Sequence, residues 1–355
     1  MFKKYSEAFR DETDFRKSID PDTLCTYGVK PLDDAMIAIA PNELIVIAAA
    51  SGYGKTELAL AISRHNALRG KQVAHYHLEG GYMEAVQRIK YHAICDLYYK
   101  KHSNAQIDLD YRKWTMNKDQ HPLLLTLESE VYNDLKDKLD NNLHFYNSPE
   151  GLTCTDFLVS LLDFHDLETA FENPGKTGGG YKLDLIVIDH LQHFSLEKEE
   201  NEIQEITKIL REAKKITELS HIPVILVSHF RKLPRGHGIP DKEDLYGTSN
   251  IHKVANTCIL VHPDHEHDKS YEGLYPTWIR VAKSRIGIRP SDLIKVDFDI
   301  TKRDYCQNYQ LYKCFSNGSI SDVALDIKER PAWAVNALSD NDTEQKLKGH
   351  HGTDR

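Results

Sequence analysis

The chain has 355 residues, enough for one α/β domain with insertions and a full hydrophobic core. It carries 54 Asp and Glu against 45 Lys and Arg, so any contact with nucleic acid must come from a local basic surface and simple coating of nucleic acid is excluded. The six cysteines are dispersed without a CxxC pair, which excludes a zinc ribbon and a disulfide framework. No stretch is apolar enough for a signal peptide or a membrane span. We therefore expect a soluble cytoplasmic protein with no membrane partner.

Aromatic residues recur among charged residues at the N-terminus. Their spacings of three, four and six predict a short amphipathic helix over residues 2–18. The aromatic residues are Phe2, Tyr5, Phe9 and Phe15. This stripe must be covered, either by the chain's own domain or by a neighbouring subunit. We assign residues 1–24 to a docking helix and linker, and residues 25–335 to the main domain.

Short apolar runs alternate with helical patterns along the main domain. Glu43–Ala50 is a continuous apolar run, typical of a strand buried on both faces of a parallel sheet, and a helical stretch follows over Lys55–Leu68. Four more strands are predicted at Val73–Leu78, Leu183–Ile188, Pro223–Ser228 and Thr257–Val261. The alternation predicts an α/β fold with a mostly parallel central sheet flanked by helices.

About 100 residues separate the second and third predicted strands. They include the polar segment Lys100–His121 and the loop Asn173–Gly180, which we interpret as surface elaborations without a core of their own. The largest is an insertion around residues 95–145. From Ser339 onward the chain is polar and nearly free of aromatic residues, so residues 336–355 are predicted to form a disordered tail.

A glycine-rich loop lies between the first strand and the helix that follows it. Ala49–Thr56 matches the Walker A pattern G-x-x-x-x-G-K-[ST], with alanine at the first glycine position. In this setting the backbone N–H groups and the helix N-terminus bind phosphate, Lys55 neutralises its charge, and the Thr56 hydroxyl completes a magnesium shell. The predicted nucleotide-binding residues are Ala50, Ser51, Gly52, Tyr53, Gly54, Lys55, Thr56 and Glu57.

Polar residues end three of the predicted strands. Asp189 closes the apolar run Leu183–Asp189 in the Walker B arrangement and would hold Mg²⁺, directly or through water. Glu79 follows the second strand and is a candidate base for the attacking water, the alternative being an exposed helix-cap carboxylate. His229 ends the fourth strand, where it could sense the γ-phosphate or serve as a hydrogen-bonded loop residue.

The order of these residues resembles the RecA-like motor domain of the DnaB-type replicative ring helicases, whose relatives include phage primase-helicases and mitochondrial Twinkle. The resemblance covers most of residues 24–300. His77-Leu78-Glu79 is similar to the family's Ser-Leu-Glu, and Ile186–Gln192 is close to its Ile-Asp-Tyr-Leu-Gln signature. The resemblance implies a RecA-like P-loop NTPase that uses ATP and Mg²⁺, with Glu79 as the catalytic base. It also implies a sensor role for His229, because the phage and mitochondrial branch carries His there.

Two further segments resemble parts of the family that act between subunits and on DNA. Lys283-Ser284-Arg285 is similar to the Lys-x-Arg pair that enters a neighbour's nucleotide site, which implies an oligomer, a hexameric ring. Residues 244–251 resemble the loop that lines the central channel, although the family's Arg-Glu-Ser-Gly is here Tyr-Gly-Thr-Ser. The residues that this resemblance and the basic segment upstream assign to DNA are Arg231, Lys232, Tyr246, Gly247, Thr248 and Ser249.

From this resemblance we expect a helicase motor that hydrolyses ATP and moves on single-stranded DNA in a bacterial or phage-infected cell. Only about 25 residues precede the motor, where family members carry a collar or primase domain, so separate primase or loader proteins are candidate partners. Two other hypotheses stay open. The chain could be a nucleotide-controlled switch or assembly module of the recombinase or clock-ATPase kind, or a phosphotransferase that uses the same phosphate cradle.

Overall fold

The described part of the chain covers most of the predicted main domain. A computed structural model describes residues 2–50, 52–102, 107, 109–118, 121–146, 151–161, 183–196, 201–231, 238–246, 250–264, 273–285, 292–315 and 319–325. The predicted tail and the loop at residues 173–180 lie outside these residues. None of the helices in the described ranges is long and apolar enough to cross a membrane.

One sheet runs through the whole described domain, in the strand order β3-β2-β4-β5-β1-β6-β7-β8-β9. The strands from β3 to β6 are parallel, and β6 to β9 are antiparallel. The parallel strands are β1 (Leu44–Ala49), β2 (Val73–His77), β3 (Leu143–Phe145), β4 (Leu185–Asp189), β5 (Val224–His229) and β6 (Thr257–Pro263). The antiparallel extension comprises β7 (Leu274–Ser284), β8 (Asp292–Asp299) and β9 (Asp304–Lys313). The predicted α/β fold with a mostly parallel sheet is confirmed.

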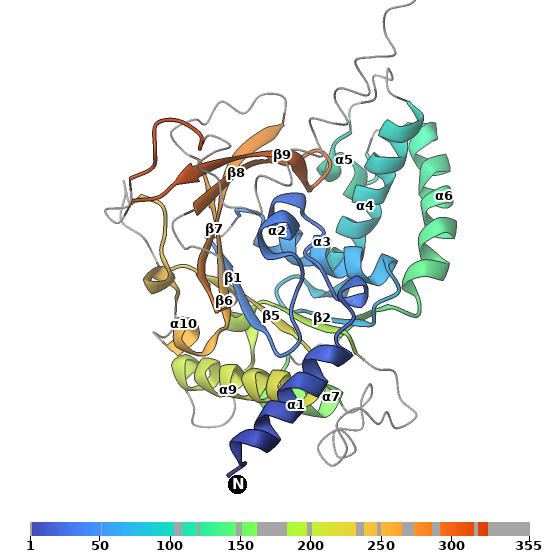
Figure 1. The fold of residues 1–355 in the computed structure, drawn as a ribbon. Helices are drawn as coiled ribbons and strands as arrows, with labels where there is room; N and C mark the ends of the chain where they lie inside the picture. Colours follow the sequence, from blue (N-terminus) through green and yellow to red (C-terminus); the bar gives the residue numbers. More distant parts are fainter. Residues whose placement is uncertain are drawn as a thin grey trace, which may run out of the picture.

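Helices cover both faces of the parallel strands (Figure 1). On one face Ile45 and Ile47 of β1 share a hydrophobic core with α2 and α3, and on the other Leu44 and Val46 share a core with α9. All six residues of β1 are buried, which explains its continuous apolar run. The helices are α1 (Tyr5–Ser18), α2 (Lys30–Met36), α3 (Lys55–Leu68), α4 (Gly81–Lys101), α5 (Tyr111–Thr115), α6 (Pro122–Leu139), α7 (Cys154–Ser160), α9 (Glu202–Ser220) and α10 (Asn250–Val254), with short 3-10 turns η1 (Pro21–Thr23), η3 (Leu191–His193) and η4 (Lys242–Asp244).

The insertion between β2 and β3 has a small core of its own, so the expectation that it would lack one is wrong. Helices α4, α5 and α6 bury Tyr91, Tyr98 and Trp114 together with Leu124 and Leu127. The ring centroids of Tyr91 and Trp114 lie 5.3 Å apart. Large aromatic side chains give this satellite cluster enough apolar area to pack without the central sheet.

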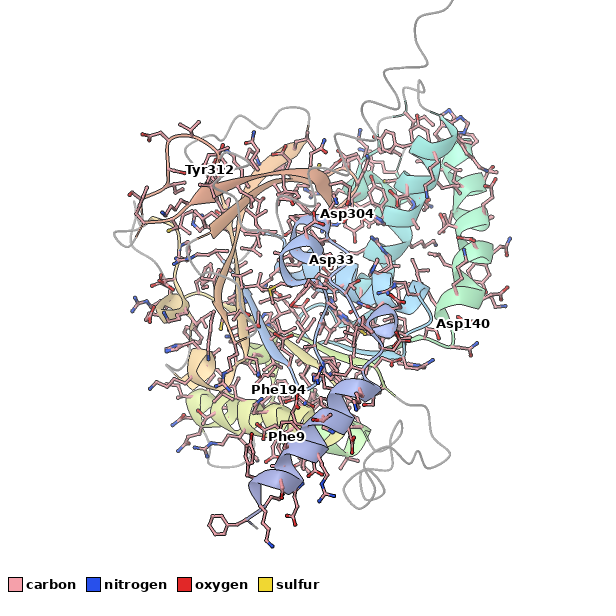
Figure 2. The ribbon with its side chains drawn as sticks, viewed as in Figure 1. Phe9, Asp33, Asp140, Phe194, Asp304 and Tyr312 are labelled. Carbon is pink, nitrogen blue, oxygen red and sulfur yellow. The ribbon has the colours of Figure 1, made fainter. Side chains whose placement is uncertain are left out.

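The first helix, α1, lies at the periphery of the molecule, where Figure 2 labels Phe9. None of its residues is buried, and Tyr5 and Phe9 are 82% and 57% exposed. Only the end of the aromatic stripe meets the domain, with the Phe15 ring 4.5 Å from that of His221. The described chain therefore leaves most of the stripe uncovered, and its docking on a neighbouring subunit stays a prediction.

Candidate functional site

The carboxyl ends of four parallel strands meet at one edge of the sheet. The strand register sets Ala49 of β1 beside His229 of β5, and His77 of β2 beside Asp189 of β4. Parallel α/β sheets bind ligands at this edge, outside the carboxyl ends of their strands. The sequence-predicted residues of the phosphate loop, Walker B and sensor segments are therefore brought together by the fold.

The phosphate loop turns sharply between β1 and α3. Gly52 and Gly54 have φ angles of +85° and +77°, a region that favours glycine, and α3 begins at Lys55. A Cβ atom on Gly54 would also lie 3.0 Å from the Tyr305 hydroxyl of β9. The loop thus has the backbone turn and the helix N-terminus that phosphate binding requires. Ser51 lies outside the described residues.

A cavity of about 370 Å³ opens beside this loop. Its walls include Lys55 and Thr56 from the loop, Glu79 from the end of β2, and Phe298 and Arg303 from the β8–β9 hairpin. The volume falls in the usual range for small-molecule sites, roughly 300–1,000 Å³. The antiparallel extension of the sheet therefore forms one wall of the candidate nucleotide site, a role that sequence reasoning missed.

Lys55 and Glu79 form an ion pair across the cavity. Lys55 Nζ donates a hydrogen bond to Glu79 Oε2 at 3.3 Å, and the lysine side chain is 5% exposed while the glutamate is 44% exposed. Partial burial raises the pKa of Glu79, but the charge of Lys55 and the hydrogen bond that it donates outweigh this effect and leave the pKa below its usual value. The carboxylate is therefore ionised at neutral pH, as a general base must be.

His190 connects Glu79 to the candidate sensor. Its Nε2 atom lies 3.3 Å from Glu79 Oε2 and 3.0 Å from His229 Nε2. Burial, with the nearby His229 and Lys55, lowers the pKa of His190 to about 4, so the ring is neutral at neutral pH. His190 was not among the site residues predicted from the sequence. The sequence feature that could have pointed to His190 is its position directly after Asp189. The family signature that this segment resembles carries tyrosine there.

Asp189 is buried at the end of β4, with 0% relative exposure. Burial raises its pKa, but the imidazole of His77 and the hydroxyl of Thr56 outweigh this effect and keep the pKa below its usual value. Neither carboxylate oxygen has a hydrogen-bond partner of normal geometry among the described residues. A buried, ionised carboxylate beside the Thr56 hydroxyl fits the oxygen ligands that Mg²⁺ prefers.

Glu57 is a buried anchor at the start of α3. Its carboxylate pairs with Arg88 of α4 and Arg303 at the β8–β9 turn, and Arg303 also lies over the Tyr111 ring at 4.3 Å. These contacts tie the first turn of α3 to the insertion and to the sheet extension. Contact of Glu57 with a nucleotide stays a prediction.

Lys283 and Arg285 lie at the opposite edge of the sheet from the phosphate loop. Lys283 pairs in register with Cys258, near the start of β6, whereas Val261 toward its end pairs with Ala49. Lys283 Nζ donates to the carbonyl oxygens of His252 and Ala255, each at 2.6 Å, at the end of α10. The fold does not bring this pair to the chain's own nucleotide site.

Two of the candidate DNA-binding residues lie next to the end of β5, and both already contact acidic residues. Arg231 Nη2 lies 2.9 Å from Asp244 Oδ1, and the Tyr246 hydroxyl donates to Glu202 Oε2 at 3.2 Å. The backbone N–H of Tyr246 donates to the carbonyl of His229 at 2.9 Å. The other candidates, Lys232, Gly247, Thr248 and Ser249, lie outside the described residues.

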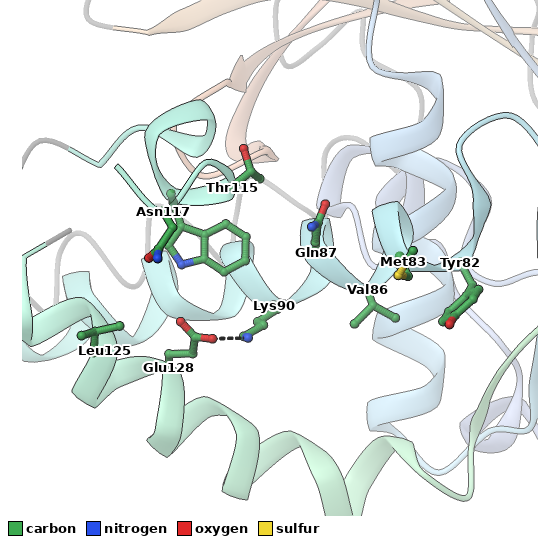
Figure 3. A pocket seen from close by; sticks show the side chains of 10 residues that line it. Tyr82, Met83, Val86, Gln87, Lys90, Thr115, Asn117, Leu125 and Glu128 are labelled. Carbon is green, nitrogen blue, oxygen red and sulfur yellow. Dashed lines mark ion pairs between the residues drawn. The ribbon is translucent and has the colours of Figure 1, made fainter. Parts of the chain in front are cut away.

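A second cavity, of about 470 Å³, lies in the insertion between α4, α5 and α6 (Figure 3). Its lining includes Met83, Val86 and Trp114, and the ion pair of Lys90 with Glu128 crosses it. Its lining includes neither the phosphate loop nor the strand-end carboxylates. The candidate residues for nucleotide hydrolysis Lys55, Thr56 and Glu79 therefore line the smaller cavity.

Comparisons with known proteins agree with this geometry. A family model described as the DnaB-like helicase C terminal domain matches residues 25–133 and 161–305. The replicative DNA helicase DnaB of Haemophilus influenzae is 26% identical over 278 residues, 77% of this chain and 53% of the relative. The replicative DNA helicase DnaC of Bacillus subtilis is 26% identical over 266 residues, 73% of this chain and 52% of the relative.

Two solved structures have a similar fold. One, described as an ATPase domain, has a TM-score of 0.66 at 18% identity, and the match covers 87% of this chain and 100% of that domain. The other, a DnaB-like replicative helicase solved in a study of its interactions with primase, has a TM-score of 0.65 at 18% identity, and the match covers 85% of this chain and 68% of that helicase. At this identity the likeness establishes the fold alone.

Proposed function

The chain belongs to the DnaB-like helicase C-terminal domain family, and from this premise we propose that it is an ATP-driven DNA helicase motor. In this proposal it forms a ring, of six subunits, and hydrolyses ATP to move along single-stranded DNA. The observation that carries the proposal is the convergence of Lys55, Glu79 and Asp189 at one sheet edge. The chain spans about half the length of the curated relatives it matches, which are named replicative DNA helicases.

The chemistry of ATP hydrolysis follows from the positions of these side chains. Lys55 and the loop N–H groups would bind the β- and γ-phosphates, and Thr56 and Asp189 would hold Mg²⁺. The bound Mg²⁺ supplies positive charge that stabilises the phosphates during transfer. Glu79, ionised and 44% exposed, would orient the attacking water and accept its proton. ATP would break the Lys55–Glu79 ion pair, which frees Glu79 for this role.

A direct path leads from the base to the candidate DNA loop. Glu79 contacts His190, His190 contacts His229, and the carbonyl of His229 accepts the N–H of Tyr246. Loss of the γ-phosphate would therefore change the contacts of Glu79, which three contacts join to Tyr246. We propose that this path couples hydrolysis to movement of the 244–251 loop along DNA.

Each nucleotide site would be completed by a neighbouring subunit. Lys283 and Arg285 lie at the sheet edge away from their own phosphate loop, which supports a role in trans. A guanidinium in that position stabilises transition-state charge on the transferred phosphoryl group. Ring formation would thus be required for full activity.

The setting in the cell is also part of the proposal. We propose the cytoplasm of a bacterial or phage-infected cell, since the relatives named above are bacterial replication proteins. Separate primase or loader proteins are proposed partners, because the solved DnaB-like helicase was studied with primase.

One observation favours a second function, a nucleotide-controlled assembly switch without unwinding. Arg231 and Tyr246, the described DNA candidates, already contact the acidic residues Asp244 and Glu202. Electron microscopy with a non-hydrolysable ATP analogue, with and without single-stranded DNA, separates the two functions. The motor proposal expects a ring threaded by DNA, whereas a filament, or a ring indifferent to DNA, would support the switch and contradict the motor.

A further inference from the structure

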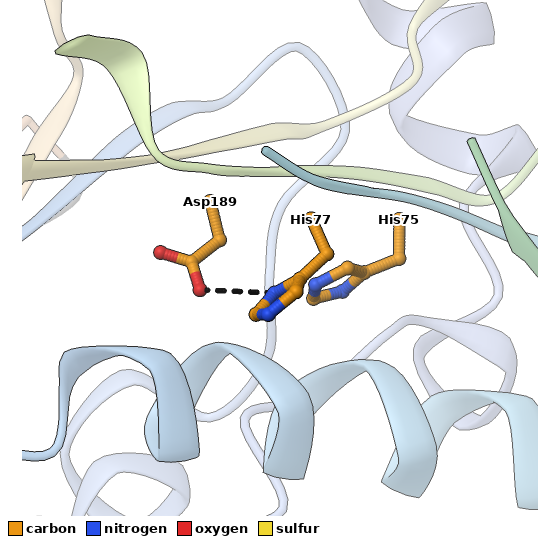
Figure 4. Close-up of side chains that lie close together, drawn as sticks. All are labelled: His75, His77 and Asp189. Carbon is orange, nitrogen blue, oxygen red and sulfur yellow. Dashed lines mark ion pairs between the residues drawn. The ribbon is translucent and has the colours of Figure 1, made fainter. Parts of the chain in front are cut away.

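Two histidines and an aspartate lie close together at β2 and β4 (Figure 4), and one of them, His77, also lines the candidate nucleotide cavity. His75 and His77 are two residues apart on β2, so their side chains leave the same face of the sheet, and the register sets His77 beside Asp189 of β4. One ligand-type atom from each lies within 4.8 Å of the other two. All three side chains are buried, with relative exposures of 0%, 3% and 0%.

Most polar atoms of this group have no partner. Nε2 of His75, both ring nitrogens of His77 and both carboxylate oxygens of Asp189 are buried without a hydrogen bond among the described residues. His77 Nδ1 lies 3.4 Å from Asp189 Oδ2. Buried polar side-chain atoms are in the large majority of cases satisfied by protein, water or an ion. Because His77 Nδ1 and Asp189 Oδ2 face each other, the atoms of the group that lack both a hydrogen bond and an ion pair among the described residues are His75 Nε2, His77 Nε2 and Asp189 Oδ1, and they indicate that a ligand satisfies them.

Ser63 of α3 fixes the orientation of His75. The Ser63 hydroxyl donates its single proton to the carbonyl of Ala59 at 3.0 Å, so at 2.8 Å from His75 Nδ1 it accepts the ring N–H. The proton of the neutral ring is therefore on Nδ1, and Nε2 presents its lone pair to the group. Metal-ligating histidines are held in the same way, by a hydrogen bond from the ring nitrogen that does not bind the metal.

We propose that His75, His77 and Asp189 bind a divalent cation of the zinc class, with a water as the fourth ligand. Two imidazole nitrogens and one carboxylate suit such an ion, whereas Mg²⁺ prefers oxygen ligands alone. Because Asp189 is also the proposed Mg²⁺ ligand, the two ions compete for it, and this competition rests on the proposed function. Zinc binding itself requires no nucleotide turnover.

The test measures Zn²⁺ binding to the full chain by competition with a chromophoric chelator, without nucleotide. The proposal expects one tight site per chain that His77→Ser weakens on the order of 100-fold or more, beyond the range for a residue that only orients a ligand. The one polar contact of the His77 ring is with Asp189 Oδ2 at 3.4 Å, so this substitution removes a ligand and otherwise breaks only a contact within the group. Ser63→Ala keeps all three ligands and should weaken binding by about 10-fold.

The matched control is His193→Ala. His193 is exposed and belongs to a different ligand-type group with Glu79 and His190, so zinc affinity should stay within about twofold of wild type.

Loss of the site in His193→Ala but not in His77→Ser would overturn the proposal, and so would absence of tight zinc binding to the wild-type chain. Thermal unfolding of each variant reports whether it folds, and Co²⁺ absorption gives the ligand geometry independently. A chain that binds zinc and never hydrolyses ATP would contradict the proposed function alone.

Discussion

Lys55 Nζ and Glu79 Oε2 lie 3.3 Å apart, so the lysine of the phosphate loop and the candidate base form an ion pair with each other. This contact joins the start of α3, which follows β1, to the end of β2, and β4 and β5 lie between β1 and β2 in the sheet. The pair keeps Glu79 ionised and turned toward the phosphate loop. In the proposed function, phosphate oxygens of the nucleotide would replace Glu79 as the partner of Lys55.

Glu79→Gln should separate binding from hydrolysis. The amide cannot accept a proton from water, so single-turnover hydrolysis should fall by about 10²- to 10⁴-fold. The ion pair that competes with phosphate for Lys55 is lost as well, so affinity for a fluorescent ATP analogue should equal or exceed that of wild type. Weaker binding together with normal hydrolysis would exclude Glu79 as the base.

Lys55→Ala should abolish turnover because it removes the charge that stabilises the transferred phosphoryl group. The expected loss in kcat is on the order of 100- to 1,000-fold, measured by steady-state phosphate release. Lys118→Ala, a change at an exposed lysine of the insertion, is the matched control and should leave turnover within about twofold of wild type. Equal effects of the two substitutions would argue against phosphate binding at the β1–α3 loop.

Mixing two inactive variants tests the shared site. Lys55→Ala subunits keep an intact Arg285, and Arg285→Ala subunits keep an intact phosphate loop, so a mixed ring contains complete sites at some interfaces. An equal mixture should recover roughly a quarter of the wild-type sites, if subunits mix at random in a closed ring. ATP turnover of the mixture no greater than the mean of the separate variants would contradict an arginine acting in trans.

Asp33, labelled in Figure 2, gives a stability prediction with a defined pH dependence. Burial raises its pKa to about 6, although the N–H of Tyr27 donates to its Oδ1 at 2.6 Å. Between its usual pKa and pH 6 the folded chain holds a proton that the unfolded chain has released, so Asp33 lowers stability as pH rises through this window. The Asp33→Asn variant has no carboxyl group at this position, so it does not lose stability in this pH window.

Urea unfolding of wild type and Asp33→Asn at pH 5.0 and pH 7.5 measures this difference. The stability of the variant relative to wild type should rise by roughly 1 kcal/mol from the lower to the higher pH. A relative stability that is flat, or that falls toward pH 7.5, would show that the carboxyl group is not held protonated by the fold.

Five of the six parallel strands could be predicted from the sequence because they are largely buried, whereas β3, with three residues and only Leu143 buried, was not predicted. β4 and β5 are continuous apolar runs that end at candidate site residues, which makes both the strands and the strand-end residues Asp189 and His229 visible. The three strands β7 to β9 were not predicted. In β7 the buried residues Ile279 and Val281 alternate with the less buried Arg280, a pattern that a search for continuous runs overlooks.

The missing parts of the site have a similar cause. His75, His77 and His190 are brought to their proposed roles by strand register and by contacts between segments more than 100 residues apart, such as His77 with Asp189. Local spacing carries no such information. The contribution of Phe298 and Arg303 to the cavity depends likewise on where the β8–β9 hairpin folds back over α3.

The most direct test of the motor is ATP turnover by the wild-type chain with and without single-stranded DNA, followed by unwinding of a forked duplex under the same conditions. The path from Glu79 through His190 and His229 to Tyr246 predicts that single-stranded DNA accelerates turnover and that strands separate only when ATP is hydrolysed. Turnover unchanged by DNA, together with no unwinding, would contradict the helicase.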